Sequence, residues 1–180
     1  PREVAAEMLA QAEHNPDSVA MLVTPDADLP DKAAAVIEEE LARLPRAAMI
    51  RQALERFARV YVVRDIEDAV RLANVLATEH LSIQTEEPMA VFERITNAGA
   101  VMLGGSTPVA VTDYYAGPNH ILPTGRRARF SSPLSAEDFR KVTNYVSYSR
   151  ERLERDADDI IKLATAEELT AHARAVEIRK

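Results

Sequence analysis

The regular alternation of helical periodicity with short apolar runs limits the fold of this chain more than any other feature. Four runs have the β-branched and aromatic content of buried strands, at 19–25, 59–63, 81–85 and 100–104. Apolar residues recur at helical spacing in the segments around them, at 2–14, 31–44, 47–57, 65–77 and 88–96, and Asp31 is a candidate helix cap. This order predicts an α/β fold with an open, largely parallel sheet and helices on both faces.

The sequence changes character after residue 134. The segment SAEDFRKVTNYV at 135–146 begins with Ser135 and carries an acid three residues later, which is a variant of the helix capping box. Helical patterns continue at 149–164 and 167–177, and no strand-like run is left to pair. We therefore expect an α/β part at 1–134 and a helical C-terminal arm at 135–180, which docks on a partner subunit.

Composition excludes several classes of function. The net charge of −7 argues against sequence-independent nucleic-acid binding, and the arginines at 126, 127 and 129 fit a solvated loop better than a basic face. No run of 18 apolar residues is present, and the absence of cysteine excludes disulfides and thiolate chemistry. No secretory signal is visible, so a cytoplasmic location is expected.

The first residues, PREVAAEMLAQAEH, already have helical spacing and contain no initiating Met at their start. We therefore expect the chain to be the later part of a longer polypeptide. Neither a P-loop nor a G-x-G-x-x-G turn after a strand occurs in it, since LGGSTP does not match. A dinucleotide-binding fingerprint, if the protein has one, lies outside these residues.

Backbone irregularity is concentrated in one region, because all five glycines lie between Gly99 and Gly125. The segment YYAGPNHILPTG at 114–125 combines two prolines with two glycines and cannot form a regular helix. Such a segment is either a rigid connector or a wall of a site. Composition alone leaves both interpretations open, and the concentration of glycines makes this region the first place to look for a site.

Each of the four histidines lies near another polar group: Gln11 with His14, Glu79 with His80, Asp113 with His120, and Glu167 and Glu168 with His172. Taken singly, these pairs fit solvated helix faces or a helix C-terminus more often than a site. Taken together, two histidines, an aspartate and an amide oxygen form a donor set that Zn²⁺ accepts. No short zinc motif connects them, so the spacing alone is a weak signal.

Six segments carry a resemblance to a known family: QAEHNPDS, ATEHLSIQT, NAGAVMLG, TDYYAGPNHILPTG, ARFSSPLSAEDFRK and AEELTAHARAVEIR. In this order they resemble motifs of the C-terminal half of histidinol dehydrogenase, and the resemblance extends over essentially the whole chain. It implies an incomplete Rossmann-like open sheet followed by the helical arm. It also implies a zinc- and NAD-dependent enzyme of histidine biosynthesis, which oxidises L-histidinol to the aldehyde and then to L-histidine with two NAD.

The resemblance also implies roles for single residues. The expected zinc ligands, which would also contact the substrate, are Gln11, His14, Asp113 and His172. His80 would be the general base that takes the alcohol proton and a substrate contact, and Glu79 would activate water for attack on the aldehyde. Glu167 is an expected substrate contact and His120 a second-line one. With these roles, the segment at 114–125 is expected to form a wall of the site that places Asp113 and His120 at its edge. A bound metal that lowers the pKa of an alcohol and an imidazole that accepts the proton are chemically consistent with these roles.

The family is homodimeric, and the resemblance implies shared active sites in which Glu167 and His172 reach the pocket of the partner subunit. The NAD-binding residues are expected in the N-terminal half of the family, outside this chain, so we expect the 180 residues alone to be inactive.

Two alternatives remain open. One is a related zinc and NAD enzyme for another small alcohol, such as a sulfonated diol. The other is a non-catalytic module that dimerises or binds zinc, and the presence of both Glu79 and His80 argues against it.

Overall fold

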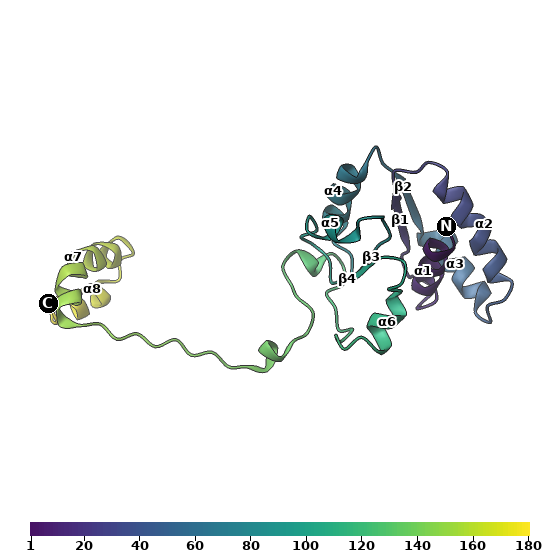
Figure 1. Cartoon of the computed structure of the whole chain (residues 1–180). Coiled ribbons are helices and arrows are strands. Elements are labelled where there is room, and N and C mark those ends of the chain that lie inside the picture. Colours follow the sequence, from purple (N-terminus) through teal and green to yellow (C-terminus); the bar gives the residue numbers. More distant parts are fainter. The chain divides into compact units, whose positions relative to one another are not determined.

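Strands and helices alternate along the first part of the chain, as the periodicity predicts (Figure 1). The computed structural model describes residues 1–180. Its elements are α1 (Arg2–Ala12), β1 (Met21–Thr24), α2 (Leu29–Leu41), α3 (Ala47–Phe57), β2 (Arg59–Val62), α4 (Ile66–Leu76), β3 (His80–Ile83), α5 (Pro88–Phe92), β4 (Ala100–Leu103), α6 (Val109–Tyr114), the 3₁₀ turns η1 (Arg127–Arg129) and η2 (Ala136–Phe139), α7 (Arg150–Ala166) and α8 (Thr170–Glu177). The predicted α/β class is confirmed.

All strand pairing is parallel and occurs within two pairs, β1 with β2 and β3 with β4. In the first sheet β1 pairs with β2, with Met21 opposite Arg59, and in the second β3 pairs with β4, with His80 opposite Ala100. The four strands thus form two two-stranded sheets, whereas the sequence suggested one open sheet. Helices α1 to α3 lie on one side of the β1–β2 pair and α4 and α5 on the other (Figure 1).

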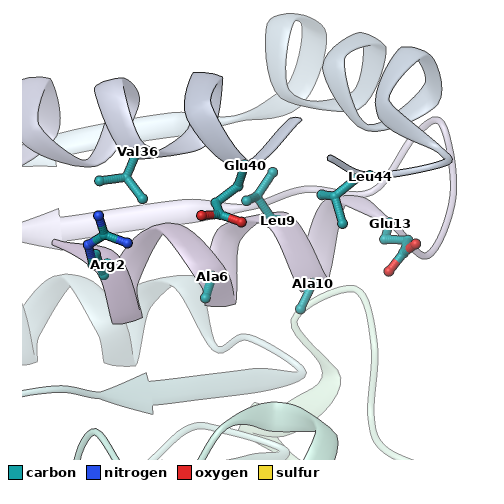
Figure 2. Close-up of a pocket in the computed structure, with 8 residues that line it drawn as sticks. All are labelled: Arg2, Ala6, Leu9, Ala10, Glu13, Val36, Glu40 and Leu44. Atoms are coloured by element: carbon teal, nitrogen blue, oxygen red, sulfur yellow. The ribbon is translucent and has the colours of Figure 1, made fainter. Parts of the chain in front are cut away.

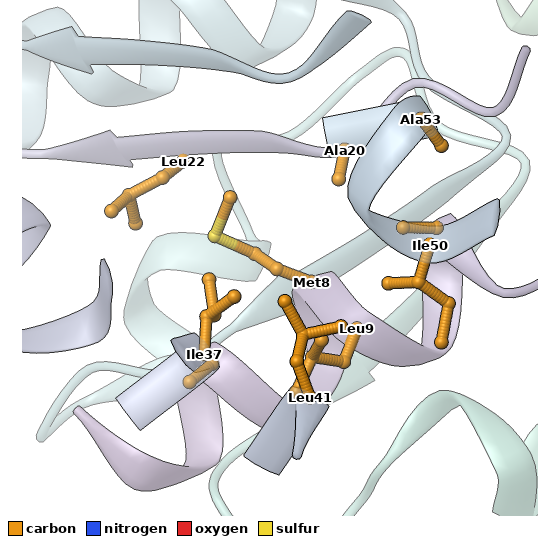
Figure 3. Close-up of a cluster of buried hydrophobic side chains, with 10 residues drawn as sticks. Met8, Leu9, Ala20, Leu22, Ile37, Leu41, Ile50 and Ala53 are labelled. Carbon is orange, nitrogen blue, oxygen red and sulfur yellow. The ribbon is translucent and has the colours of Figure 1, made fainter. Parts of the chain in front are cut away.

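The hydrophobic core lies where α1, α2 and α3 pack against β1 (Figure 3). Its members are all small or aliphatic: Ala5, Met8, Leu9, Ala12, Ala20, Leu22, Ile37, Leu41, Ile50 and Ala53. Burial of such side chains contributes about 25 cal/mol for each Å² of apolar surface removed from water. Helix α1 therefore has one face fixed in the core, and its other faces are free to carry polar residues.

Helix boundaries follow local capping chemistry. The Asp65 side chain accepts a hydrogen bond from the Asp68 N–H at 2.8 Å and caps α4. The expectation for Asp31 is wrong, because α2 begins earlier, at Leu29, with Asp28 in the N-cap position. Pro30 occupies the first turn of α2, where its fixed φ favours a helix start and its missing N–H costs nothing.

The helix expected at 135–146 is mostly absent. The Ser135 N–H donates to the Asp138 carboxylate and the Ser135 hydroxyl oxygen accepts from the Glu137 N–H, which resembles a capping box, but only the turn η2 follows. Residues 140–149 have no regular structure. Val142 and Val146 are 83% and 85% exposed, so no tertiary contact compensates for the low helix propensity of β-branched residues. Favourable capping residues are therefore not sufficient to form a helix at 135–146 when no face of that helix would be buried.

The chain divides into two units, Pro1–Asp138 and Phe139–Lys180. The first contains both sheets and the core. The second consists of α7 and α8, which pack on each other through the buried Ala157 and Ala173. No helix of the structure is long and apolar enough to cross a membrane.

Candidate active site

His80 and Asp113 form the most unusual polar pair of the first unit. The imidazole Nε2 of His80 lies 3.6 Å from Oδ1 of Asp113, and the two side chains are only 13% and 11% exposed. His80 is the first residue of β3, and Asp113 lies in the last turn of α6. His80 and Asp113, both candidates from the sequence motifs, are 33 positions apart in the sequence and are thus brought together by the fold.

Both members of this pair have buried polar atoms without a hydrogen-bond partner. These are Nδ1 and Nε2 of His80 and Oδ1 of Asp113, and Gln84 Oε1 and Thr85 Oγ1 beyond the end of β3 share this property. Most buried polar atoms in proteins are paired, because an unpaired one costs about 1–3 kcal/mol. Unpaired imidazole nitrogens beside a carboxylate are therefore typical of a site that binds a polar ligand or a cation.

The backbone before β3 is held by contacts with the segment that leads into β4. The Gly99 N–H donates to the Thr78 carbonyl at 2.9 Å, and the Ala100 N–H donates to the Glu79 carbonyl at 2.8 Å. A Cβ on Gly99 would lie 2.6 Å from the Glu79 carbonyl oxygen, which is too close for any other residue. Gly99 thus allows this approach, which sets the position of Glu79 and His80.

Asn74 fixes the same segment from the other side. Its side-chain oxygen accepts hydrogen bonds from the Thr96 N–H at 2.7 Å and the Asn97 N–H at 3.2 Å, and its Nδ2 donates to the Arg94 carbonyl at 3.0 Å. One residue of α4 therefore organises the turn that delivers Gly99.

The irregular segment after α6 lies against Asp113 and against Gly99. The imidazole Nδ1 of His120 lies 3.4 Å from the backbone oxygen of Asp113. The buried Pro123 places its Cδ 3.2 Å from the position that a Cβ on Gly99 would occupy. The segment predicted as a wall thus lies against the backbone of Asp113 and against the glycine that positions Glu79.

Glu79 precedes the first strand residue and lies at a bend of the backbone. Side chains of consecutive strand residues point to opposite faces of a sheet, and this alternation does not fix the direction of a residue outside the strand. Glu79 is half-buried. It is therefore free to share a site with its neighbour His80.

Gln11 and His14 lie at the C-terminal end of α1. Gln11 is half-buried, whereas His14 lies just beyond the helix and is exposed, with its N–H 3.4 Å from the Gln11 carbonyl. Glu7, one turn before Gln11, accepts a hydrogen bond from the Val109 N–H at 3.1 Å, and Val109 is the first residue of α6. Glu7 belongs to none of the predicted site residues, although its spacing to Gln11 and His14 places it on the same side of α1.

Burial raises the pKa of the Glu7 carboxyl above its ordinary value, and the hydrogen bond from Val109 and the nearby His80 oppose that change. Glu7 therefore lies close enough to His80 for an electrostatic interaction between the two side chains.

The remaining expected residues belong to the second unit. Glu167 directly follows α7, and His172 lies in the first turn of α8, and both are exposed. Glu168, between them, has a left-handed backbone with φ of 60°. The structure describes this unit by itself, so the roles expected for Glu167 and His172 remain predictions.

The zinc set has suitable chemistry but is not assembled as a compact cluster. No three His, Cys, Asp or Glu side chains of residues 1–180 lie together as metal ligands do. Of the expected set, only His14 and Asp113 are of these types in the first unit, and Gln11 adds an amide. The unpaired, buried Oδ1 of Asp113 fits a cation as partner. Convergence of the set on one ion is therefore a proposal.

The groove between α1 and α2 is a separate feature (Figure 2). It has a volume of about 350 Å³ and is lined by Arg2, Ala6, Leu9, Ala10, Glu13, Val36, Glu40 and Leu44. None of the residues expected to do chemistry lines it. It is open and largely aliphatic, so it is not the candidate active site.

Comparison with known proteins agrees with the sequence motifs. The family model described as histidinol dehydrogenase matches residues 1–180. Proteins named histidinol dehydrogenase from Syntrophotalea carbinolica and Heliobacterium mobile are each 46% identical over 179 residues, which is 99% of this chain and 42% of each relative. A crystal structure of histidinol dehydrogenase from Elizabethkingia anophelis superimposes with a TM-score of 0.90 at 36% identity, over 99% of this chain and 41% of that one.

The chain thus spans less than half the length of the relatives it matches. The match is nevertheless continuous, and it extends across both units and through every motif discussed above. The chain belongs to the histidinol dehydrogenase family.

Proposed function

We propose that the complete protein containing this chain is a cytoplasmic histidinol dehydrogenase, which oxidises L-histidinol through L-histidinal to L-histidine with zinc and two NAD. Family membership supports the substrate class. The observation that carries the proposal is the buried pair of His80 and Asp113, whose polar atoms lie 3.6 Å apart and have no other partner. A purely structural pair of this kind would normally be hydrogen-bonded.

In this proposal His80 is the general base. Its ring is held at the start of β3, with Nε2 3.6 Å from the Asp113 carboxylate. The substrate hydroxyl would approach Nε2, the nitrogen on the Asp113 side, and its proton would pass to that atom. Proton transfer then requires no rearrangement of the backbone, because Gly99 and the β4 pairing already fix this residue.

Glu79 is assigned the second proton transfer. After the first oxidation, its carboxylate takes a proton from the water that attacks the aldehyde carbon. Glu79 is half-buried, so its carboxylate remains in part accessible to water. Holding the aldehyde between the two oxidations favours an enclosed site, and the segment with His120 and Pro123 would provide part of that enclosure.

Gln11, His14 and Asp113 would hold the zinc ion together with His172 of α8. When bound, the ion supplies Lewis-acid chemistry, which makes the alcohol proton easier to remove. This chain contains no dinucleotide fingerprint, so we assign NAD to the part of the polypeptide outside it.

The second unit is proposed to dock on a second copy of the protein, which would then receive Glu167 and His172. Phe139, Val142, Tyr145 and Val146 precede α7, and between 80% and 92% of each side chain is exposed. Four large apolar side chains in one short segment are typical of a surface that another chain covers. The two-helix unit has only two buried alanines, so it also gains stability from such a partner.

The test is histidinol-dependent NADH formation by the complete protein, with zinc present and after chelation. We expect about two NADH per histidinol, loss on chelation, and recovery with Zn²⁺. His80→Ala and Glu79→Gln are compared as variants, and the exposed Glu55→Gln of α3 is a control that should retain activity.

Zinc binding without histidinol oxidation would contradict the assigned substrate and favour another small alcohol. Absence of both zinc binding and oxidation would favour a non-catalytic module.

A further inference from the structure

Two segments of the first unit run side by side with a constant offset. Helix α1 places Glu7 against Val109, and these residues are 102 positions apart in the sequence. One turn earlier, a Cβ on Gly105 would lie 3.0 Å from Oε1 of Glu3, a pair with the same separation. Continued four residues further along both segments, the same offset would bring Gln11 opposite Asp113.

This regularity links Glu7 to two of the proposed zinc ligands. Residues four apart on a helix share a face, so Glu7 lies directly below Gln11 on α1 and Val109 directly below Asp113 on α6. The Glu7 carboxylate therefore joins the two helices one turn away from the ligands that they carry. No other hydrogen bond in the structure links α1 to α6.

The bond also satisfies a group that α6 leaves open. The first N–H groups of a helix have no partner within it, and the residue before α6 is Pro108, whose side chain cannot cap. Val109 is buried, with 5% of its surface exposed, so water does not replace the carboxylate easily. Glu7 is itself half-buried, at a site where ionised groups are rarely placed without a reason.

We propose that Glu7 is a positioning residue of the zinc site, which sets the register of α1 against α6 and thereby the approach of Gln11 to Asp113. This inference rests on the zinc site of the proposed function. Glu7 does not touch metal or substrate; it acts through the Val109 N–H. What matters is the reach of its oxygen, and its negative charge is secondary.

Three variants of the complete protein separate reach from charge. Glu7→Gln keeps an oxygen acceptor at the same distance and removes the charge, Glu7→Asp keeps the charge and withdraws the oxygen, and Glu7→Ala removes both. Glu3→Ala is the matched control, because it truncates the same residue type one turn earlier, where no hydrogen bond to the backbone is lost. Zinc affinity is measured by chelator competition, and ligand geometry by the visible spectrum of the Co²⁺-substituted protein.

Since outer-sphere partners of a metal site usually change affinity by about 10- to 100-fold, we expect Glu7→Asp and Glu7→Ala to bind zinc at least about tenfold more weakly, with an altered Co²⁺ spectrum. Glu7→Gln and Glu3→Ala should stay within about threefold of wild type on the same scale. The comparison of zinc affinity between Glu7→Gln and Glu7→Asp is informative even if Glu7→Ala does not fold. A higher zinc affinity of Glu7→Asp than of Glu7→Gln would overturn the proposal.

Asp113→Asn, measured in parallel, distinguishes failure of the proposed zinc site from failure of the positioning role of Glu7. If it weakens zinc binding and Glu7→Asp does not, the role of Glu7 is refuted and the zinc site stands. If Asp113→Asn leaves zinc binding unchanged, the proposed zinc site is refuted, and the role of Glu7 with it.

Discussion

At the scale of single residues, Gly99 shows how strictly the site depends on close backbone contact. A methyl group at this position would meet the Glu79 carbonyl oxygen at 2.6 Å and Pro123 at 3.2 Å, and neither neighbour is a flexible side chain. The strand start with Glu79 and His80 must then move. We expect Gly99→Ala to destabilise the complete protein by about 1–3 kcal/mol, as overpacking does, and to lower kcat more than it raises KM.

The control is Gly105→Ala. A Cβ there would meet only the far end of the Glu3 side chain, at 3.0 Å, and that side chain can turn away. Urea unfolding and steady-state kinetics of both variants check the prediction. Equal behaviour of the two variants would show that the Gly99 contact is not a constraint on the site.

The sequence motifs identified His80, Asp113 and the segment with His120, and the structure places these three together. The motifs do not reveal a role for Glu7, because an acidic residue on the polar face of a helix cannot be distinguished from a solvated surface residue until its partner is known. That partner, Val109, contributes only a backbone N–H, which every residue except proline has. Contacts of side chains with distant backbone are thus the part of a site that single-sequence reasoning misses.

At the scale of elements, the start of α7 depends on one carboxylate. Asp156 accepts hydrogen bonds from the Tyr148 hydroxyl at 2.6 Å and from the Arg155 Nε at 2.9 Å, and Arg152 is a further donor. Hydrogen bonds from Tyr148 and then from these arginines hold the pKa of Asp156 well below its usual range. The carboxylate therefore joins the residue before the helix to its second turn.

The lowered pKa of Asp156 determines how the stability of the start of α7 changes with pH. Because the folded-state pKa is lowered, the stabilisation is complete above the ordinary Asp pKa of about 3.9 and is lost as pH falls toward the folded-state value. We expect hydrogen-exchange protection at 149–157 to decline below pH of about 4 in wild type, and to be lower and less pH-dependent in Asp156→Asn.

Asp158→Asn is the matched control, because Asp158 is exposed and bonds to Lys180 at the far end of the unit. It should leave the pH dependence of the first turns unchanged. A wild-type profile in Asp156→Asn would contradict the role given to this carboxylate.

Element prediction succeeded where periodicity and burial agree. All four predicted strands and the helices at 2–14, 47–57, 65–77, 149–164 and 167–177 are present with small changes at their ends. Helix α6 escaped notice because TPVAVTDYY is short and β-branched, which is unusual for a helix. It forms because Val109 is buried and because Glu7 satisfies its first N–H, and both causes lie outside the local sequence.

At the scale of the whole molecule, the proposed sharing of sites between two copies has a clear test. A His80→Ala chain and a His172→Ala chain, each inactive alone, are mixed, dissociated and allowed to reassociate. If His172 serves the site of the partner, each mixed dimer has one intact site. Half of randomly formed dimers are mixed, so about a quarter of wild-type activity should return.

Two His80→Ala preparations mixed in the same way control for the reassociation step and should stay inactive. Recovery near zero in the mixed sample would place His172 in the site of its own chain.

The division into an α/β part and a helical part was visible in the sequence as the disappearance of strand-like runs. The separation of the strands into two pairs was not visible, since periodicity identifies strands but not their neighbours. In the structure the first unit ends at Asp138, whereas the sequence placed the boundary after residue 134, and the docking role of the second part remains a prediction.

The long sequence separation between α1 and α6 also has a consequence for the order in which the first unit folds. Met21 pairs with Arg59 and His80 with Ala100, so each sheet closes a short loop of chain and can form early. The Glu7–Val109 bond spans 102 residues, and its larger closure entropy makes it a late contact. We therefore expect secondary structure to return before α1 and α6 align and bring the proposed ligands together. The ability to bind metal is then the last property that the first unit regains during refolding.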